Sequence, residues 1–269
     1  MTADAPTATP SSRGPFLKQA LALWLGGMIG FVCVLPYLMQ LKGENLAEAA
    51  AEAGMSPEIL LLLAGVQQGV TLVVFVFGGL AASRKLGLET PLTAALVAGG
   101  SVRDEVKRWW KPAVVWGGSL GAVVLGLSFA FQPYLPEGFA EMSGGMTWWQ
   151  GLLASFYGGI AEELMLRLFV MSVMALVLRF LFARSRTDLP DGIFWAANVG
   201  SAVLFGLGHL PAVMGLMEIT GVLVAYAILL NGILGVNFGW LFRKYGIEAA
   251  MLAHFTADIV LHVIPALFK

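Results

Sequence analysis

The chain has 269 residues and a formal net charge of −1 at pH 7; 58% of its residues are hydrophobic and only 12% are charged. A soluble domain carries about twice that charged fraction, so the composition indicates an integral membrane protein rather than a soluble one. The near-neutral charge gives no indication of a nucleic-acid partner. A single cysteine, Cys33, excludes a disulfide framework and a CxxC metal site.

The N-terminal segment is rich in small and polar residues and contains proline. We expect residues 1–15 to form a disordered cytoplasmic N-terminus, because this composition buries too little apolar surface to fold. The apolar run that follows, 16–41, is too long for the hydrophobic part of a signal peptide and has no clear cleavage site. It is therefore predicted to remain as the first transmembrane helix.

Apolar windows long enough to cross a bilayer recur along the whole chain. Segment 90–100 is apolar but too short to span, and the fourth window is longer than one crossing needs, so seven or eight helices remain open. We expect an all-α polytopic membrane helix bundle, with N-terminal transmembrane helices in 16–146 and a C-terminal core in 147–269. The windows are 16–41, 58–82, 110–132, 147–179, 192–214, 217–242 and 247–268.

The connecting segments alternate in charge. Acidic residues dominate after the first and third windows, whereas basic residues precede the first window and follow the second, fourth and sixth. This alternation satisfies the positive-inside rule if seven helices cross the membrane and the N-terminus is cytoplasmic. We therefore expect an integral protein of the plasma (inner) membrane. The basic residues of these four segments are Arg13, Lys18, Arg84, Lys85, Arg103, Lys107, Arg108, Lys111, Arg179, Arg184, Arg186, Arg243 and Lys244.

The fourth window contains the motif EELMLR, which places Glu162, Glu163 and Arg167 inside an otherwise nearly uncharged run. Ionisable residues inside a membrane helix are costly and usually mark a functional site. Glu163 and Arg167 are four residues apart with the acid first, which is the spacing of a helical ion pair. Glu162 lies about 100° further round an α-helix, where it has no local counter-charge and can accept a proton.

All three histidines lie in the last third of the chain, within apolar segments. Asp258 follows His254 by one helical turn on the same face. Because intramembrane His and Asp side chains face a bundle interior, Glu162, His209, His254 and Asp258 are expected to converge in a cavity within the last four helices. His262, one turn further, is expected to pack or to contact the site indirectly.

The depth of the histidines in the membrane leaves this convergence open. By the rise of 1.5 Å per residue, His209 lies about 27 Å from Asp191, and His254 about 12 Å from Gly246. The two histidines can meet only if the helices tilt, start late or break near Pro211.

Three motifs on successive apolar helices, EExxxR, FxxxH and HxxxD, resemble the CPBP family of intramembrane proteases. That family includes the type II CAAX prenyl proteases and the bacterial Abi or bacteriocin-processing proteins. The resemblance implies a glutamate-type endopeptidase that works inside the bilayer on a membrane-associated, possibly prenylated, protein or peptide. The matching residues are Glu162, Glu163, Arg167, Phe205, His209, His254 and Asp258.

The resemblance also implies roles for these residues. Glu162 and His209 would activate a water molecule for attack on a peptide carbonyl, and His254 with the residue at position 258 would stabilise the oxyanion. The ion pair would hold the helix geometry. Amide hydrolysis needs a base for water, a proton donor for the leaving amine and donors aimed at the developing oxyanion, and a Glu with two His can supply them.

The third motif departs from the prenyl proteases, which carry Asn where this chain has Asp258. An amide can donate a hydrogen bond to an oxyanion, whereas an ionised carboxylate repels one. Either Asp258 is protonated, or it orients and charges His254, which then donates alone. Other family members carry Asp at this position, so the departure bears on the substrate more than on the family.

Other functions fit some of these residues. No cofactor is expected, although Glu162, His209 and His254 could supply three zinc ligands with an open fourth position. A catalytically silent scaffold or immunity-type protein would keep the same fold. A small proton-coupled transporter would use Glu, His and Asp at mid-depth as a relay.

Overall fold

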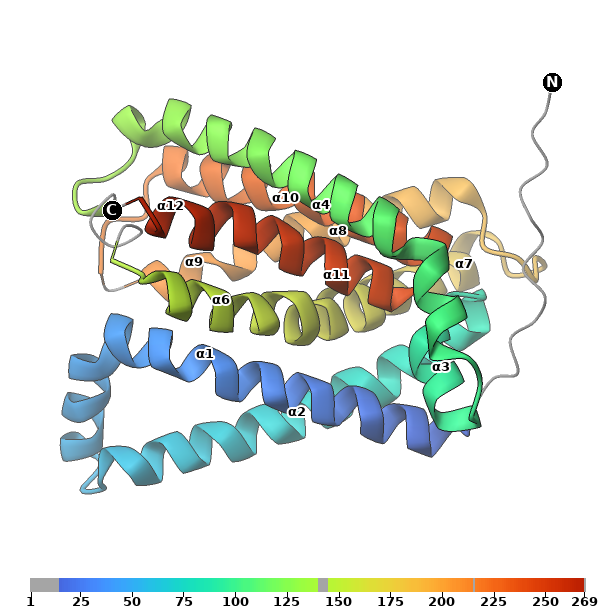
Figure 1. Cartoon of the computed structure of the whole chain (residues 1–269), viewed down its shortest axis with the longest axis horizontal. Coiled ribbons are helices and arrows are strands. Elements are labelled where there is room, and N and C mark those ends of the chain that lie inside the picture. The colour runs from blue at the N-terminus through green and yellow to red at the C-terminus, as the bar shows by residue number, and fades with distance from the viewer. Residues whose placement is uncertain (1–14, 140–144, 215, 269) are drawn as a thin grey trace.

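The computed structural model describes residues 15–139, 145–214 and 216–268, and in these ranges the fold is built from helices joined by short connections (Figure 1). This confirms the expected all-α polytopic bundle. The predicted disordered N-terminus falls almost entirely on residues 1–14, which lie outside the described residues.

Seven of the described helices are long and apolar enough to cross a membrane, which decides between the two expected numbers. The apolar segment at 90–100 forms only the short helix α3, Pro91–Ala98. Several spans are continued by short helical segments. The spans are α1 (Phe16–Glu52), α2 (Pro57–Leu86), α4 with η1 (Val102–Phe131, Gln132–Tyr134), the fourth span (Trp148–Phe182), α8 with α9 (Asp191–Gly208, Leu210–Val213), α10 (Gly221–Tyr245), and α11 with η4 and α12 (Ile247–Asp258, Ile259–Val263, Ile264–Ala266).

The fourth span changes helical type along its length. It begins after Thr147, whose backbone N–H and hydroxyl both donate to Gln150 Oε1, at 3.0 and 2.8 Å. Its central part is π-helical on both sides of Glu163, and such i→i+5 segments occur often at functional sites. The EELMLR motif therefore lies on a wider helix than the α-helix assumed from the sequence. The components are α6 (Trp148–Phe156), η2 (Tyr157–Glu162), η3 (Leu164–Met171) and α7 (Ser172–Phe182).

The helices pack in layers around this fourth span. The α1–α2 hairpin lies against it on one side of the molecule, and α4 packs against α10 and α11 on the other (Figure 1). Glycines allow two of these contacts to be very close. A Cβ at Gly79 of α2 would lie 2.7 Å from the carbonyl oxygen of Leu168, and one at Gly117 of α4 would collide with that of Ala253.

The short helix α3 is fastened to the turn between α10 and α11. Gly246 occupies that turn with φ +100°, a conformation that favours glycine. The next residue, Ile247, donates its N–H to the carbonyl oxygen of Glu89 at 3.1 Å. Glu248 Oε1 then accepts the N–H and the hydroxyl of Thr93, at 2.8 and 2.7 Å. These contacts set where α11 starts, and α11 carries His254.

Candidate active site

The acidic motif of the fourth span forms a fully buried ion pair. Arg167 Nη1 lies 3.0 Å from Glu163 Oε1, and both side chains have no exposed surface. The guanidinium also lies over two aromatic faces, 4.4 Å from the ring centre of Phe205 and 5.3 Å from that of Phe238. Ring faces attract cations, so a carboxylate and two rings together compensate the buried charge of Arg167.

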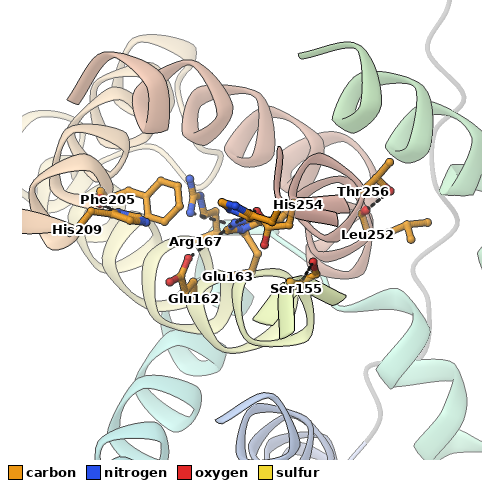
Figure 2. A network of polar contacts seen from close by, with 12 residues as sticks. Ser155, Glu162, Glu163, Arg167, Phe205, His209, Leu252, His254 and Thr256 are labelled. Carbon is orange, nitrogen blue, oxygen red and sulfur yellow. Dashed lines mark hydrogen bonds and ion pairs between the residues drawn. The ribbon is translucent and has the colours of Figure 1, made fainter. Parts of the chain in front are cut away.

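His254 of α11 binds the same carboxylate oxygen. Its Nδ1 donates to Glu163 Oε1 at 2.8 Å, a contact between residues 91 positions apart in the chain. Its ring stacks on Phe238 with ring centres 4.6 Å apart. Figure 2 shows Glu163 and Arg167 between Phe205 and His254, with Glu162 to one side. The ring of His254 is therefore held at its edge and on one face.

The second nitrogen of His254 faces two further carboxylates. Nε2 lies 3.8 Å from Glu162 Oε2 and 3.7 Å from Asp258 Oδ1. Both distances are longer than a hydrogen bond and suit a bridging water or substrate oxygen. Glu162 is partly accessible, with 20% of its side chain exposed, whereas Glu163 is closed off. Of the two adjacent glutamates, Glu162 is the one that a small molecule can reach.

Gly158 closes the site on the side of the fourth span. A Cβ at this position would collide with Asp258 Oδ2 and lie 3.1 Å from His254 Nε2. The absence of a side chain therefore lets the π-helical segment approach the two groups directly. The neighbouring Gly159 is equally tight, because a Cβ there would lie 2.9 Å from the carbonyl oxygen of Met251.

His209 lies at the C-terminal end of α8, and Phe205 separates it from His254. The His209 ring meets the Phe205 ring edge-on, with ring centres 4.9 Å apart. The His254 ring also meets Phe205 edge-on, with ring centres 5.5 Å apart. Nδ1 of His209 donates to the carbonyl oxygen of Phe205 at 2.8 Å, which leaves Nε2 as an acceptor in the neutral ring. Within the described residues, no hydrogen bond or ion pair joins His209 to Glu162.

The structure thus places a carboxylate oxygen of Glu162 and one of Asp258 each within 4 Å of His254 Nε2. His209 lies on the other side of the Phe205 ring. The question of the depth of the two histidines is answered by Phe205, since the rings of both His209 and His254 contact it. His262 lies 4.0 Å from Asp258 with 45% of its side chain exposed, at the edge of the group.

Two contacts of this site were not foreseen from the sequence. The spacing of the motif predicts Arg167 as the partner of Glu163, and the structure adds His254 as a second partner. Phe238, which stacks on His254 and faces Arg167, was not singled out. The only sequence signal for Phe238 is its place in a glycine-rich stretch, GVNFGW, just before the last helix.

The zinc alternative finds no ready ligand set in the structure. In the ranges that the structure describes, no three His, Cys, Asp or Glu side chains are grouped as a metal ion requires. Glu162 and His254 are near each other, but His209 lies beyond Phe205.

Comparison with protein families identifies the region that carries this site. Residues 144–260 match the family model described as type II CAAX prenyl endopeptidase Rce1-like. The match confirms the family resemblance predicted from the three motifs, and it covers the last four spans except for the end of the chain. Comparisons with curated proteins and with solved structures found no match.

Proposed function

Because residues 144–260 match the type II CAAX prenyl endopeptidase Rce1-like family, we propose that this integral membrane protein is an intramembrane endopeptidase. One observation supports it above the others. The 2.8 Å contact from His254 Nδ1 to Glu163 turns Nε2 toward Glu162 and Asp258, so that a base and a donor face the same small space. Such an arrangement is what hydrolysis by an activated water requires.

In the proposed reaction, Glu162 takes a proton from water, and the water oxygen attacks the carbonyl carbon of the scissile bond. Glu162 suits this role because it is partly accessible and has no hydrogen bond or arginine partner among the described residues. His209 assists through Nε2, which can accept a hydrogen bond from the same water or from the substrate. The C–N bond then breaks as Glu162 returns the proton to the leaving amine.

His254 stabilises the oxyanion of the tetrahedral intermediate. It carries a proton on each ring nitrogen in this proposal, with Nδ1–H donated to Glu163 and Nε2–H available to the developing negative charge. Asp258, at 3.7 Å from Nε2, favours the charged ring and does not itself donate. In this proposal Asp258 has a positioning role. Glu163 and Arg167 hold His254 in place.

The substrate belongs to the same proposal. A site among apolar helices is suited to a peptide bond presented from within or beside the bilayer, so we infer a membrane protein or membrane-associated peptide, with prenylated C-terminal peptides as one class to test. By the positive-inside rule, the basic helix ends favour a cytoplasmic N-terminus, and we propose that the protein lies in the plasma (inner) membrane. Reporter fusions at the N-terminus and in the acidic segment after α1 test this orientation.

The test of the activity is cleavage of a peptide library, including prenylated C-terminal peptides, by the purified protein and by Glu162→Gln, each with and without a chelator. We expect cleavage that persists with the chelator and falls by about 10²–10⁴-fold in Glu162→Gln. Glu44→Gln, in the acidic segment far from the site in sequence, is the control for loss of a carboxylate. Thermal unfolding in detergent checks that each variant folds.

The other outcomes are equally decisive. Activity lost with the chelator assigns Glu162 and the histidines to a metal. Undiminished cleavage by Glu162→Gln removes Glu162 from the mechanism. If folded wild-type protein cleaves none of the peptides, the proposal fails in favour of a scaffold of the same fold.

A further inference from the structure

An open cavity lies at the end of the bundle where α2 ends, α8 begins and α10 ends. Its volume is about 770 Å³, which is within the size range of small-molecule sites. It shares no lining residue with the group around His254. The charged residues that line it are Arg84, Lys85, Arg186, Asp188, Asp191 and Arg243.

The walls of this cavity, which we call the basic cavity, are held together by the protein itself. Arg179, at the end of α7, donates through Nη1 to the carbonyl oxygens of Lys85 and Thr187, both at 3.1 Å. Arg243 donates to the carbonyl oxygen of Leu189 at 3.4 Å and lies over Phe194 of α8. Hydrogen bonds within the protein therefore hold the walls of the basic cavity in place.

The lining has an excess of positive charge, with four basic and two acidic side chains. Arg186 forms two hydrogen bonds to Asp188, at 3.0 and 2.7 Å, and these hold the pKa of Asp188 below its usual value. Arg243 lies 2.6 Å from Asp191, whose side chain is 84% exposed. Exposed ion pairs contribute little stability, so an incoming phosphate can take the place of either carboxylate at small cost.

Two further features favour a phosphate group. The helix α8, of 18 residues, starts at the cavity, and no side chain caps its first N–H groups. Helix N-termini of this kind bind anions through their N–H groups and dipole. The last turn of α7, beside the cavity, carries Phe180, Leu181 and Phe182 with 58%, 62% and 77% of their surface exposed. Acyl chains can cover these side chains while a headgroup occupies the cavity.

We propose that the basic cavity is a binding site for the headgroup of an anionic phospholipid, independent of the catalytic proposal. The apolar end of α7 favours a lipid over a soluble phosphate compound, because acyl chains can pack on its exposed side chains while the headgroup meets the arginines. Basic pockets between transmembrane helices bind anionic lipids in this way in other proteins.

The test measures binding of phosphatidylglycerol, of phosphatidylcholine with the same acyl chains, and of inorganic phosphate to the purified full-length protein by native mass spectrometry. We expect phosphatidylglycerol to bind more tightly than phosphatidylcholine. Arg186→Gln should weaken phosphatidylglycerol about fivefold, the effect of one basic residue near a membrane surface. Asp188→Asn should strengthen it, because it removes a competing carboxylate.

The matched control is Arg103→Gln, which removes the same charge at the start of α4. Arg103 is exposed and does not line the basic cavity, so its replacement should leave phosphatidylglycerol binding unchanged. Equal affinity for the two lipids, or equal losses in the two arginine variants, would overturn the proposal. Binding of inorganic phosphate without preference for phosphatidylglycerol would overturn the lipid assignment and identify a soluble ligand.

Discussion

The first three spans and the last four are all apolar enough to cross a bilayer, but they differ in how much of each lies inside the protein. In their most apolar stretches, 17–22% of the residues of the first three spans are buried, against 33–39% in the last four. The ionisable residues of the candidate site all lie in the second group. Hydropathy thus identifies which helices can cross the membrane, whereas burial distinguishes the spans that surround the site from the more exposed ones.

The first three spans nevertheless support the site through close backbone contacts. Gly79 of α2 meets the backbone at Leu168, next to Arg167, and Gly117 of α4 meets the backbone of Ala253, next to His254. The N-terminal region therefore brings no ionisable side chain to the site, but it packs closely against each of the two helices that carry Arg167 and His254. Three predictions test these different contributions of the N-terminal and C-terminal spans, from the largest expected effect to the smallest.

Replacing Arg167 tests the ionic core of the C-terminal region. Arg167→Met leaves the charge of Glu163 buried and without its arginine, so we expect a loss of about 3–5 kcal/mol in the free energy of unfolding. Denaturant titration in detergent micelles measures it. The double variant Arg167→Met with Glu163→Gln removes the stranded charge and should recover part of that loss. Additive losses in the double variant would show that the charge is not the cause.

Replacing Gly117 tests the support from the N-terminal region. Gly117→Ala forces a methyl group against the backbone of α11, and overpacking of this kind costs about 1–3 kcal/mol. The matched control is Gly126→Ala on the same helix, where a Cβ meets no atom within 4 Å. That change should instead stabilise the helix by about 0.5–1 kcal/mol. The same unfolding measurement applies, and equal effects at the two glycines would contradict a specific contact.

Replacing Glu248 tests the junction between the two regions. Glu248→Leu removes the acceptor of two hydrogen bonds from Thr93, so we expect a loss of about 1–2 kcal/mol. Glu248→Gln keeps an acceptor oxygen at the same place and should unfold close to the wild type. Thermal unfolding of both variants, together with that of Thr93→Val, measures the junction. A large loss in the Gln variant would mean that the charge of Glu248, rather than its acceptor oxygen, is needed.

Much of this protein could be predicted from its sequence, because the relevant signals are local. The length and apolarity of each window determine whether a helix can span a bilayer, and this identified all seven spans. The order of three short motifs was enough to indicate the family resemblance of the C-terminal region, as the match over 144–260 confirms. The pairing of Glu163 with Arg167 followed from their spacing on one helix.

Only the tertiary structure decided how the motifs meet. The π-helical turns around Glu163 and the end of α8 before His209 were not visible in the sequence pattern, and the start of α11 depends on the contact of Glu248 with the distant Thr93. Those contacts made Glu163 the partner of His254 and placed Phe205 between the histidines. The basic cavity likewise requires three helix ends to come together. A sequence specifies helix length and face through neighbouring residues, but relative depth and tilt come from packing over the whole bundle.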